Sequence, residues 1–241
     1  RRSHPVIWAV DHGAQDITRL MRTALAEPLA QKLAAVAGGV FQMQQASLLG
    51  EAATRDALLQ ALAARAPAVV VTSSHGATFP LDDAAALRAV LGVPVDQQRC
   101  LLDLAALGQW APDGCIWYAH ACCSAGADGA SSFSGLFNAT SSLARTLDAI
   151  ARAGPCVAPL PQALLSAEKP ARAFVGHVEP TFDWTLRDPV TRQVTAQSLI
   201  DMFTRGLLSS RGEPLGMALD RHFRTVGGLL FNHIAALGEV N

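Results

Sequence analysis

An alternation between short apolar segments and segments of helical periodicity constrains the fold of this chain more than any other feature. The apolar segments are rich in β-branched or aromatic residues, and most are too short for helices. Runs of this kind, ended by Gly, Pro, Ser or Asp, are typical of strands buried on both faces of a sheet. We predict strands at residues 6–10, 40–44, 68–73, 115–120, 156–160 and 171–178, of which 40–44 is the weakest.

Helical patterns occupy the segments between these strands. The clearest covers 141–153, where Thr140 or Ser141 would cap the start and Gly154 the end. A long pattern over about 16–36 contains Pro28, which predicts a kink or break. Further helices are predicted at 54–66, from an N-cap at Asp82 to Gly92, at 196–209 and at about 214–237, with an irregular loop or hairpin over 180–192.

Strands that alternate with helices predict an α/β fold. We expect a sandwich with a mostly parallel sheet of about six strands and helices on both faces. The 241 residues are enough for one core, and no linker, repeat or low-complexity tract divides the sequence. We therefore expect an α/β core over residues 1–180 and a loop and helical C-terminal extension over 181–241, packed on the same domain.

Composition and charge argue against several classes of protein. Half of the residues are hydrophobic and the mean hydropathy is +0.24, which excludes extended disorder. A net charge of −1 without a basic run argues against a broad nucleic-acid interface, and no apolar stretch is long enough to predict a membrane span. The five cysteines include the adjacent Cys122 and Cys123, a poor disulfide pair, so we expect reduced thiols and a cytoplasmic location. The chain begins at Arg1 without a signal peptide and could be a fragment of a longer protein.

Two of the predicted strands run directly into reactive side chains. The strand at 68–73 leads into Ser74-His75-Gly76, and the strand at 115–120 leads into Ala121-Cys122. Function gathers at the carboxyl ends of strands in open α/β sheets, so neighbouring strands would bring His75 and Cys122 together. An imidazole beside a thiol can generate the thiolate, which is the stronger nucleophile. Taken singly, each residue is more often structural, and the case rests on the pair.

The pattern strand–Ser-His-Gly followed by strand–Ala-Cys-x-Ser resembles the caspase-like cysteine peptidases. This superfamily includes caspases, metacaspases, gingipains, separases and the bacterial CHAT domains. The resemblance covers residues 5–180, and Cys122 lies 47 residues after His75, close to the spacing of about 50 in caspases. It implies a caspase-like sandwich and a cysteine endopeptidase without a cofactor. His75 would be the base and Cys122 the nucleophile of a thioester mechanism, with the backbone N–H groups of Gly76 and Cys122 as the oxyanion hole.

Several positions depart from the family pattern. Cys123 is a second thiol beside the first, and Ala125 is inserted before the following glycine. His120 stands where metacaspases have Asp and caspases have Gln. His12, after the first strand, repeats the His-Gly pattern, but the family spacing selects His75.

The resemblance also points to a pocket for P1, the substrate residue that precedes the cleaved bond. His120 would line this pocket, and a basic P1 would draw on the carboxylates of Asp128, Glu179 and Asp183. Trp184 would add to the pocket wall. The plainer interpretation is that His120 caps its strand and that 179–184 is a solvated loop with one packed tryptophan.

Other interpretations stay open at this point. A non-catalytic caspase-like module could bind partners or scaffold an assembly, although the presence of both His75 and Cys122 favours a peptidase. We expect a protein or peptide substrate, with further domains of a longer chain or a regulatory partner as open options, and neither nucleic acid nor membrane. No metal site is expected, because no Cys/His pair at ligand spacing complements His120, Cys122 and Cys123. We interpret His177, His222 and His233 as structural.

Overall fold

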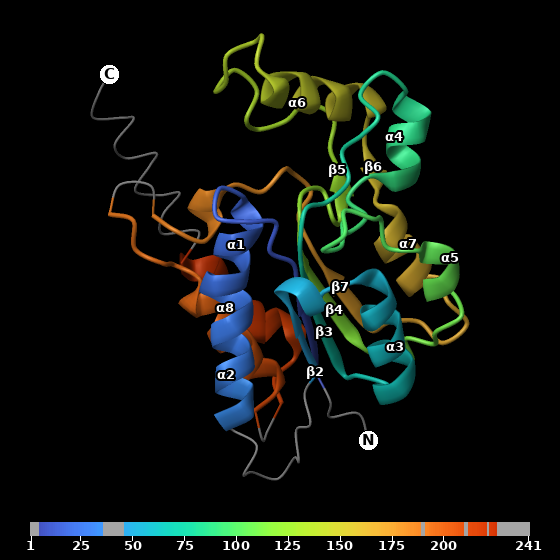
Figure 1. The fold of residues 1–241 in the computed structure, drawn as a ribbon, viewed down its shortest axis with the longest axis vertical. Helices are drawn as coiled ribbons and strands as arrows, with labels where there is room; N and C mark the ends of the chain where they lie inside the picture. The colour runs from blue at the N-terminus through green and yellow to red at the C-terminus, as the bar shows by residue number, and fades with distance from the viewer. Residues whose placement is uncertain (1–4, 36–45, 189–190, 210–211, 221, 226–241) are drawn as a thin grey trace.

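A parallel sheet lies at the centre of the protein, in a computed structural model that describes residues 5–35, 46–188, 191–209, 212–220 and 222–225 (Figure 1). The strand order is β2-β1-β3-β4-β7, and all four pairings are parallel. This is the predicted α/β sandwich, with five strands in the main sheet instead of about six. The strands are β1 (Val6–Ala9), β2 (Ala46–Leu49), β3 (Val69–Ser73), β4 (Ile116–His120) and β7 (Ala173–Val175).

Helices cover both faces of this sheet, with α1, α2 and α8 on one side and α3 and α5 on the other (Figure 1). Two segments, η1 (Arg22–Ala26) and η5 (Met202–Leu207), are π-helical, and two more, η3 (Gly50–Ala52) and η4 (Asp183–Thr185), are 3₁₀ turns. None of the described helices is both long and apolar enough to cross a membrane. The α-helices are α1 (Ile17–Met21), α2 (Glu27–Ala35), α3 (Arg55–Arg65), α4 (Ala84–Val90), α5 (Leu104–Leu107), α6 (Ser142–Ala153), α7 (Pro159–Leu165) and α8 (Gln197–Asp201).

Alternation along the strands divides the core between the two faces. Ile7 of β1 and Val71 of β3 point to the face that carries α1, α2 and α8. Trp8 and Trp117 point to the opposite face, which carries α3, α5 and α7, and both indoles are fully buried. Each indole N–H has a partner, because Trp8 donates to the Thr54 carbonyl and Trp117 to the Thr72 hydroxyl. Burial on both faces explains why the strands are continuously apolar in sequence.

Two predicted strands differ from the structure. The predicted strand at 40–44 lies outside the described residues, and β2 begins at Ala46. The predicted strand at 156–160 is wrong beyond its first two residues: β6 (Cys156–Val157) is followed by α7. Pro159 starts that helix, because its fixed φ and missing N–H suit the first helical position. β6 pairs antiparallel with β5 (Gly126–Ala127) in a separate two-stranded sheet.

The helix boundaries follow the sequence signals closely, with two corrections. The start of α6 is capped by Ser141, whose hydroxyl accepts from the Ala144 N–H, and Gly154 follows its last residue. The helix α4 is capped by Asp83 and not by Asp82, because the Asp83 carboxylate accepts from the second and third N–H groups of the helix. The chain stays helical through Pro28, so the structure has no break at this residue, and the change from π-helical η1 to α2 falls just before it, at Glu27.

The C-terminal extension packs into the same core as the sheet. Leu186, Leu199 and Phe203 belong to the apolar cluster on the face of α1 and α2. Phe203 also contacts the ring of Tyr118 on β4, edge to face with centroids 5.4 Å apart. The segment before α8 contains one isolated antiparallel bridge, between Arg187 and Val194, whereas residues 180–186 form loop and the 3₁₀ turn η4, so the described part of the predicted loop or hairpin over 180–192 is mainly irregular. Residues 215–220 and 222–225 are helical.

Gly76 joins the loop after β3 to the loop after β4 by close backbone contact. A Cβ atom on Gly76 would lie 2.0 Å from the carbonyl oxygen of Cys122. We predict that Gly76→Ala lowers the free energy of unfolding by about 1–3 kcal/mol, since neither backbone can move away easily. Urea denaturation measures this loss, with Gly129→Ala as the control because no atom lies within 4 Å of its added methyl. Equal stability of the two variants would contradict the close contact.

Candidate active site

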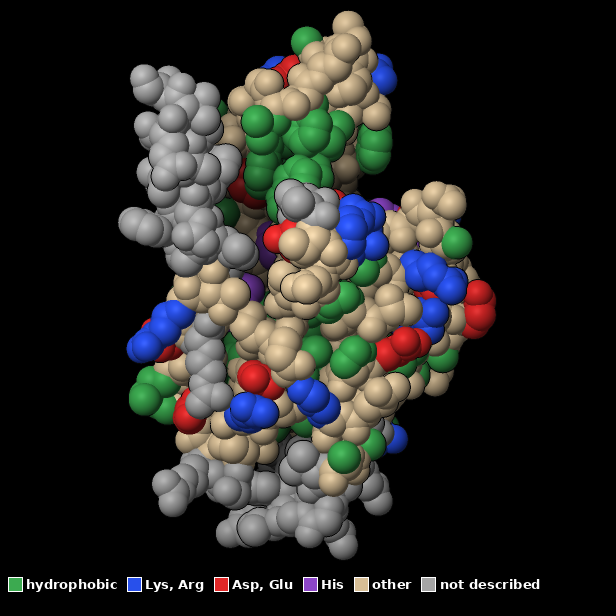
Figure 2. Space-filling model, turned by 90° about the vertical axis from the view of Figure 1, so that its left-hand side faces the viewer, with side chains coloured by type: hydrophobic (Ala, Val, Ile, Leu, Met, Phe, Trp, Pro, Cys, Tyr) green, Lys and Arg blue, Asp and Glu red, His purple; other side chains and the backbone are tan. Residues whose placement is uncertain are grey.

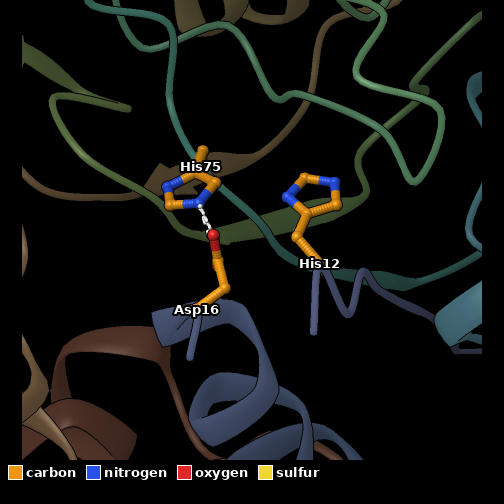
Figure 3. A group of neighbouring side chains, drawn as sticks. All are labelled: His12, Asp16 and His75. Atoms are coloured by element: carbon orange, nitrogen blue, oxygen red, sulfur yellow. Dashed lines mark hydrogen bonds and ion pairs between the residues drawn. The ribbon is translucent and has the colours of Figure 1, made fainter. Parts of the chain in front are cut away.

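His75 follows β3 and is held by an aspartate from another segment. Its Nε2 lies 2.9 Å and 3.0 Å from the two carboxylate oxygens of Asp16 (Figure 3). Asp16 is the N-cap of α1, and its Oδ1 also accepts from the Thr18 N–H at 2.9 Å and from the Thr18 hydroxyl at 2.6 Å. The start of α1 therefore fixes the carboxylate, and the carboxylate orients the imidazole.

The protonation of Asp16 determines what His75 can do. Burial alone would raise the pKa of Asp16, but the hydrogen bonds from Thr18 and His75 outweigh it and lower the pKa to about 2. An ionised carboxylate only accepts hydrogen bonds, so Nε2 of His75 is the protonated nitrogen of the ring. A neutral His75 ring consequently keeps its lone pair on Nδ1, where it can take up a proton.

Cys122 follows β4, and its thiol contacts the backbone of the loop after β7. The Thr181 N–H donates to Sγ at 3.3 Å, and Sγ donates to the Thr181 carbonyl at 3.7 Å. Burial raises the pKa of the Cys122 thiol, while hydrogen bonds from the backbone N–H groups of Thr181, Cys122 and Gly76 act in the opposite direction. Two of these donors, Gly76 and Cys122, are the N–H groups expected from sequence at an oxyanion hole.

Sheet pairing brings the His75 and Cys122 segments to the same edge. Ser73 pairs with His120 across β3 and β4, so both chains leave the sheet at the same level. Gly76 then packs against the Cys122 backbone. Within the described residues no hydrogen bond joins the His75 and Cys122 side chains, since the imidazole is bonded to Asp16 and the thiol to Thr181.

Cys123 lies in a different environment from its neighbour. Its side chain is fully buried in the apolar cluster of α4 and α6, whereas Cys122 is partly buried. Its φ of 53° places it in the left-handed region and turns the chain at this point. Burial raises the pKa of the Cys123 thiol, and the neighbouring Cys122, Glu179 and Cys156 raise it further. Cys123 is therefore held as a neutral thiol within a core.

His120 is buried in a polar cluster beneath the site. Its Nδ1 lies 2.9 Å from the Tyr118 hydroxyl and 3.4 Å from Nε2 of His177, and its Nε2 is buried without a hydrogen-bond partner. Burial lowers the pKa of His120 well below its usual range, and the neighbouring His177 and His222 add to this. Burial also lowers the pKa of His177 to about 4. The rings of His120 and His177 are therefore neutral at pH 7.

The predicted carboxylates of the P1 pocket already have partners on the protein. Glu179 accepts from the Ser131 hydroxyl and from the backbone and hydroxyl of Ser132, at 2.7–3.0 Å. Asp183 lies 3.4 Å from Arg187 and 3.9 Å from Arg192. Asp128 is exposed, and its carboxylate accepts from the Gly129 N–H. A basic P1 side chain would therefore compete with these contacts for two of the three carboxylates.

Aromatic side chains gather directly beyond Thr181. Phe182 stacks on Trp184 with ring centroids 4.3 Å apart and meets Phe133 edge to face at 4.9 Å. Trp184 keeps 38% of its surface exposed. Hydrophobic side chains collect on the upper part of one face of the molecule, and histidine side chains are visible in a recess below them (Figure 2). A hollow of about 490 Å³ on the surface is lined by both Asp16 and Asp183.

The structure places His12 beside His75, although the sequence offered them as competing candidates. The two rings are nearly parallel, 16° apart, with centroids 5.5 Å from each other. Asp16 was not identified from the sequence. The feature that could have identified it is its position as the N-cap of the first helix after β1, the strand that pairs with β3.

Searches against protein-family models, curated proteins and solved structures give no match to this chain.

The histidines with lowered pKa values predict a loss of stability in mild acid. His177 takes up a proton near pH 4 in the folded state but near pH 6.5 in the unfolded state, so the unfolded state binds more protons between these values. The free energy of unfolding should fall as the pH drops from about 6.5 towards 4. At pH 5 we expect His177 to contribute about 1–2 kcal/mol of this loss.

Chemical denaturation of wild type and His177→Gln across this range measures the effect. The variant should show a shallower fall in the free energy of unfolding, with His120 and His222 accounting for the remainder. At pH 7.5, where the histidine is neutral in both states, its titration makes no contribution. An unchanged pH slope in the variant would contradict the burial of a neutral His177.

Proposed function

We propose that this protein is a cysteine endopeptidase of the caspase-like type, in which Cys122 is the nucleophile and His75 the proton-transferring base. The observation that carries the proposal is the Asp16–His75 pair at the end of β3. The contact with Asp16 leaves Nδ1 of His75 as the basic nitrogen. His75 also lies on a loop whose next residue, Gly76, packs on the backbone of Cys122. A carboxylate that orients an imidazole, on a loop packed against the backbone of the cysteine, supports the proposal, and the hydrogen bond between imidazole and thiol would form only after the thiol leaves Thr181.

The reaction begins when the Cys122 thiol transfers its proton to Nδ1 of His75 and Sγ attacks the peptide carbonyl. Sγ is bonded to Thr181 in the structure, so attack needs a rotation of the Cys122 side chain that exchanges Thr181 for the substrate. The backbone N–H groups of Gly76 and Cys122 hold the oxyanion. His75 gives its proton to the departing amine, leaving a thioester. Water then attacks the thioester, His75 takes up its proton, and the acid product leaves as the thiol is restored.

We place the substrate beside the aromatic residues that gather near Thr181. Phe182, the next residue after Thr181, contacts Trp184 and Phe133, and the three rings offer an apolar wall close to the contact between Thr181 and the nucleophile. This wall supports a role for Trp184 in contacting an apolar substrate side chain. A basic P1 stays the hypothesis from the resemblance, with Asp128, whose exposed carboxylate has only the Gly129 N–H as a partner within the described residues, as its best-placed carboxylate. A peptide library varied at P1 decides between the two.

A cytoplasmic location and a peptide or protein substrate complete the proposal. All five cysteines are free thiols, which is the state that a reducing compartment maintains. One observation favours a second candidate, a non-catalytic caspase-like module: burial raises the pKa of the Cys122 thiol, and a neutral thiol is a poor nucleophile. The two candidates predict different results for peptide cleavage. A peptidase loses activity in the Cys122 and His75 variants, whereas a non-catalytic module cleaves no peptide either as wild type or as a variant.

We predict that Cys122→Ala abolishes cleavage of the P1-varied library and that Cys123→Ala retains much of it. Cys122 adjoins the oxyanion donors, whereas Cys123 is enclosed by the cluster of α4 and α6. His75→Ala should lower kcat/KM by roughly 10²–10⁴-fold, the usual contribution of a general base. Cleavage rates and the melting temperature of each variant provide the measurement. Full activity in Cys122→Ala would refute the proposed nucleophile.

Asp16 should act as a positioning residue for His75. We predict that Asp16→Asn lowers kcat/KM by roughly 10²–10⁴-fold, because the amide no longer selects the ring tautomer with its lone pair on Nδ1. Asn caps a helix as well as Asp does, so α1 is preserved. The matched control is Asp83→Asn, the same exchange at the N-cap of α4. If the two variants lose the same activity, or if Asp16→Asn leaves the pH–rate profile unchanged, Asp16 has no positioning role.

A further inference from the structure

Three side chains from two segments, the connection between β1 and α1 and the loop after β3, converge at the edge of the sheet. His12 comes from the loop after β1, Asp16 from the N-cap of α1, and His75 from the loop after β3 (Figure 3). One ligand atom from each lies within 4.8 Å of the other two. The parallel pairing of Ala9 with Ser73 brings the loops together, so no spacing pattern in the sequence reveals the group.

The His12 ring is already oriented as a metal ligand would be. Its Nε2 lies 2.9 Å from the carbonyl oxygen of Asp96, which can only accept a hydrogen bond, so this nitrogen carries the proton. The lone pair is then on Nδ1, which is buried and has no hydrogen-bond partner. A nitrogen of the His12 ring faces the His75–Asp16 pair in Figure 3. A ring N–H that donates to a backbone carbonyl is the usual outer support of a metal-binding histidine.

The other two side chains are fixed and reachable from solvent. Asp16 is held by Thr18, and its oxygens already lie 2.9 Å and 3.0 Å from Nε2 of His75. The side chains of His75 and Asp16 are 34% and 22% exposed, which leaves room for a further ligand from solvent. Two imidazole nitrogens and one carboxylate, with an open position, form a donor set that suits Zn²⁺ and related ions.

We propose that His12, Asp16 and His75 form a binding site for a divalent transition-metal ion, with Zn²⁺ as the best match. Metal–ligand bonds of about 2.0–2.2 Å place neighbouring ligand atoms about 3.3 Å apart in a tetrahedron. The ligand atoms that now lie up to 4.8 Å apart must therefore close by up to about 1.5 Å, whereas Nε2 of His75 and the Asp16 carboxylate, now 2.9 Å apart, must open slightly. The ion replaces the proton on Nε2 of His75, and that proton moves to Nδ1, or to solvent if the ring was already doubly protonated.

Metal binding and peptide cleavage would exclude each other at this site. With the ion on Nε2, the remaining ring proton lies on Nδ1, and His75 has no lone pair with which to receive the proton of Cys122. Zn²⁺ would also take the Asp16 carboxylate away from His75. This regulatory consequence rests on the proposed function, whereas the metal site itself does not.

Calorimetric titration of the chelator-treated protein with Zn²⁺ tests the site directly. Wild type should bind one equivalent, and His12→Ala should lower the affinity at least 100-fold. His12→Gln gives the same test with a side chain closer in size, and circular dichroism checks that each variant is folded. His222→Ala and Cys122→Ala should keep wild-type affinity. Bound Co²⁺ should show visible d–d bands without a thiolate charge-transfer band.

The proposal is overturned if wild type binds neither Zn²⁺ nor Co²⁺. It is also overturned if both folded His12 variants bind Zn²⁺ as tightly as wild type, or if a thiolate band shows that cysteine holds the ion. None of these measurements uses peptide cleavage. A protein that binds zinc through His12 but cleaves no peptide refutes the proposed peptidase alone, and an active protein that binds no zinc refutes the metal site alone.

Discussion

The parallel hydrogen bonding of β1, β3 and β4 is the interaction on which the proposed site depends. Ala9, Ser73 and His120 lie at one level across these strands, so the three following loops leave the sheet side by side. Side chains far apart in sequence thereby reach one edge. Gly76 completes the arrangement, because any side chain there would collide with the Cys122 backbone. A shift of register between β1, β3 and β4 would displace these loops relative to one another and separate the side chains that they carry.

Burial raises the pKa at both ends of the proposed proton path, but hydrogen bonds outweigh it at only one of them. Asp16 stays ionised despite its burial, because Thr18 and His75 donate hydrogen bonds to it. The Cys122 thiol is kept neutral, because burial outweighs the N–H groups around it. In the proposed mechanism the base is therefore oriented before substrate binds, whereas the thiol becomes nucleophilic only after substrate replaces its contact with Thr181. The pKa values of the buried His120 and the partly buried His177 are also lowered, so the free energy of unfolding falls as the pH drops.

Local signals in the sequence predicted the elements well and the contacts between distant segments poorly. The strands that end at Ser73 and His120, and the caps at Ser141 and Gly154, follow from apolar runs and end residues. Pro159 was placed in a strand because an apolar run alone does not distinguish a strand from a helix start. The pairing of Asp16 with His75, and the enclosure of His120 by Tyr118 and His177, depend on strand order and packing that no local pattern encodes.

Covalent labelling with a peptidyl electrophile, followed by mass mapping, tests the proposed nucleophile most directly. The account predicts modification at Cys122, with much slower labelling in His75→Ala because the thiol then lacks its base. Cys100 and Cys156 are also partly exposed and serve as internal references for ordinary thiol reactivity. Labelling at these two residues in place of Cys122, or equal rates at Cys122 in wild type and His75→Ala, would contradict a catalytic pair at this edge of the sheet.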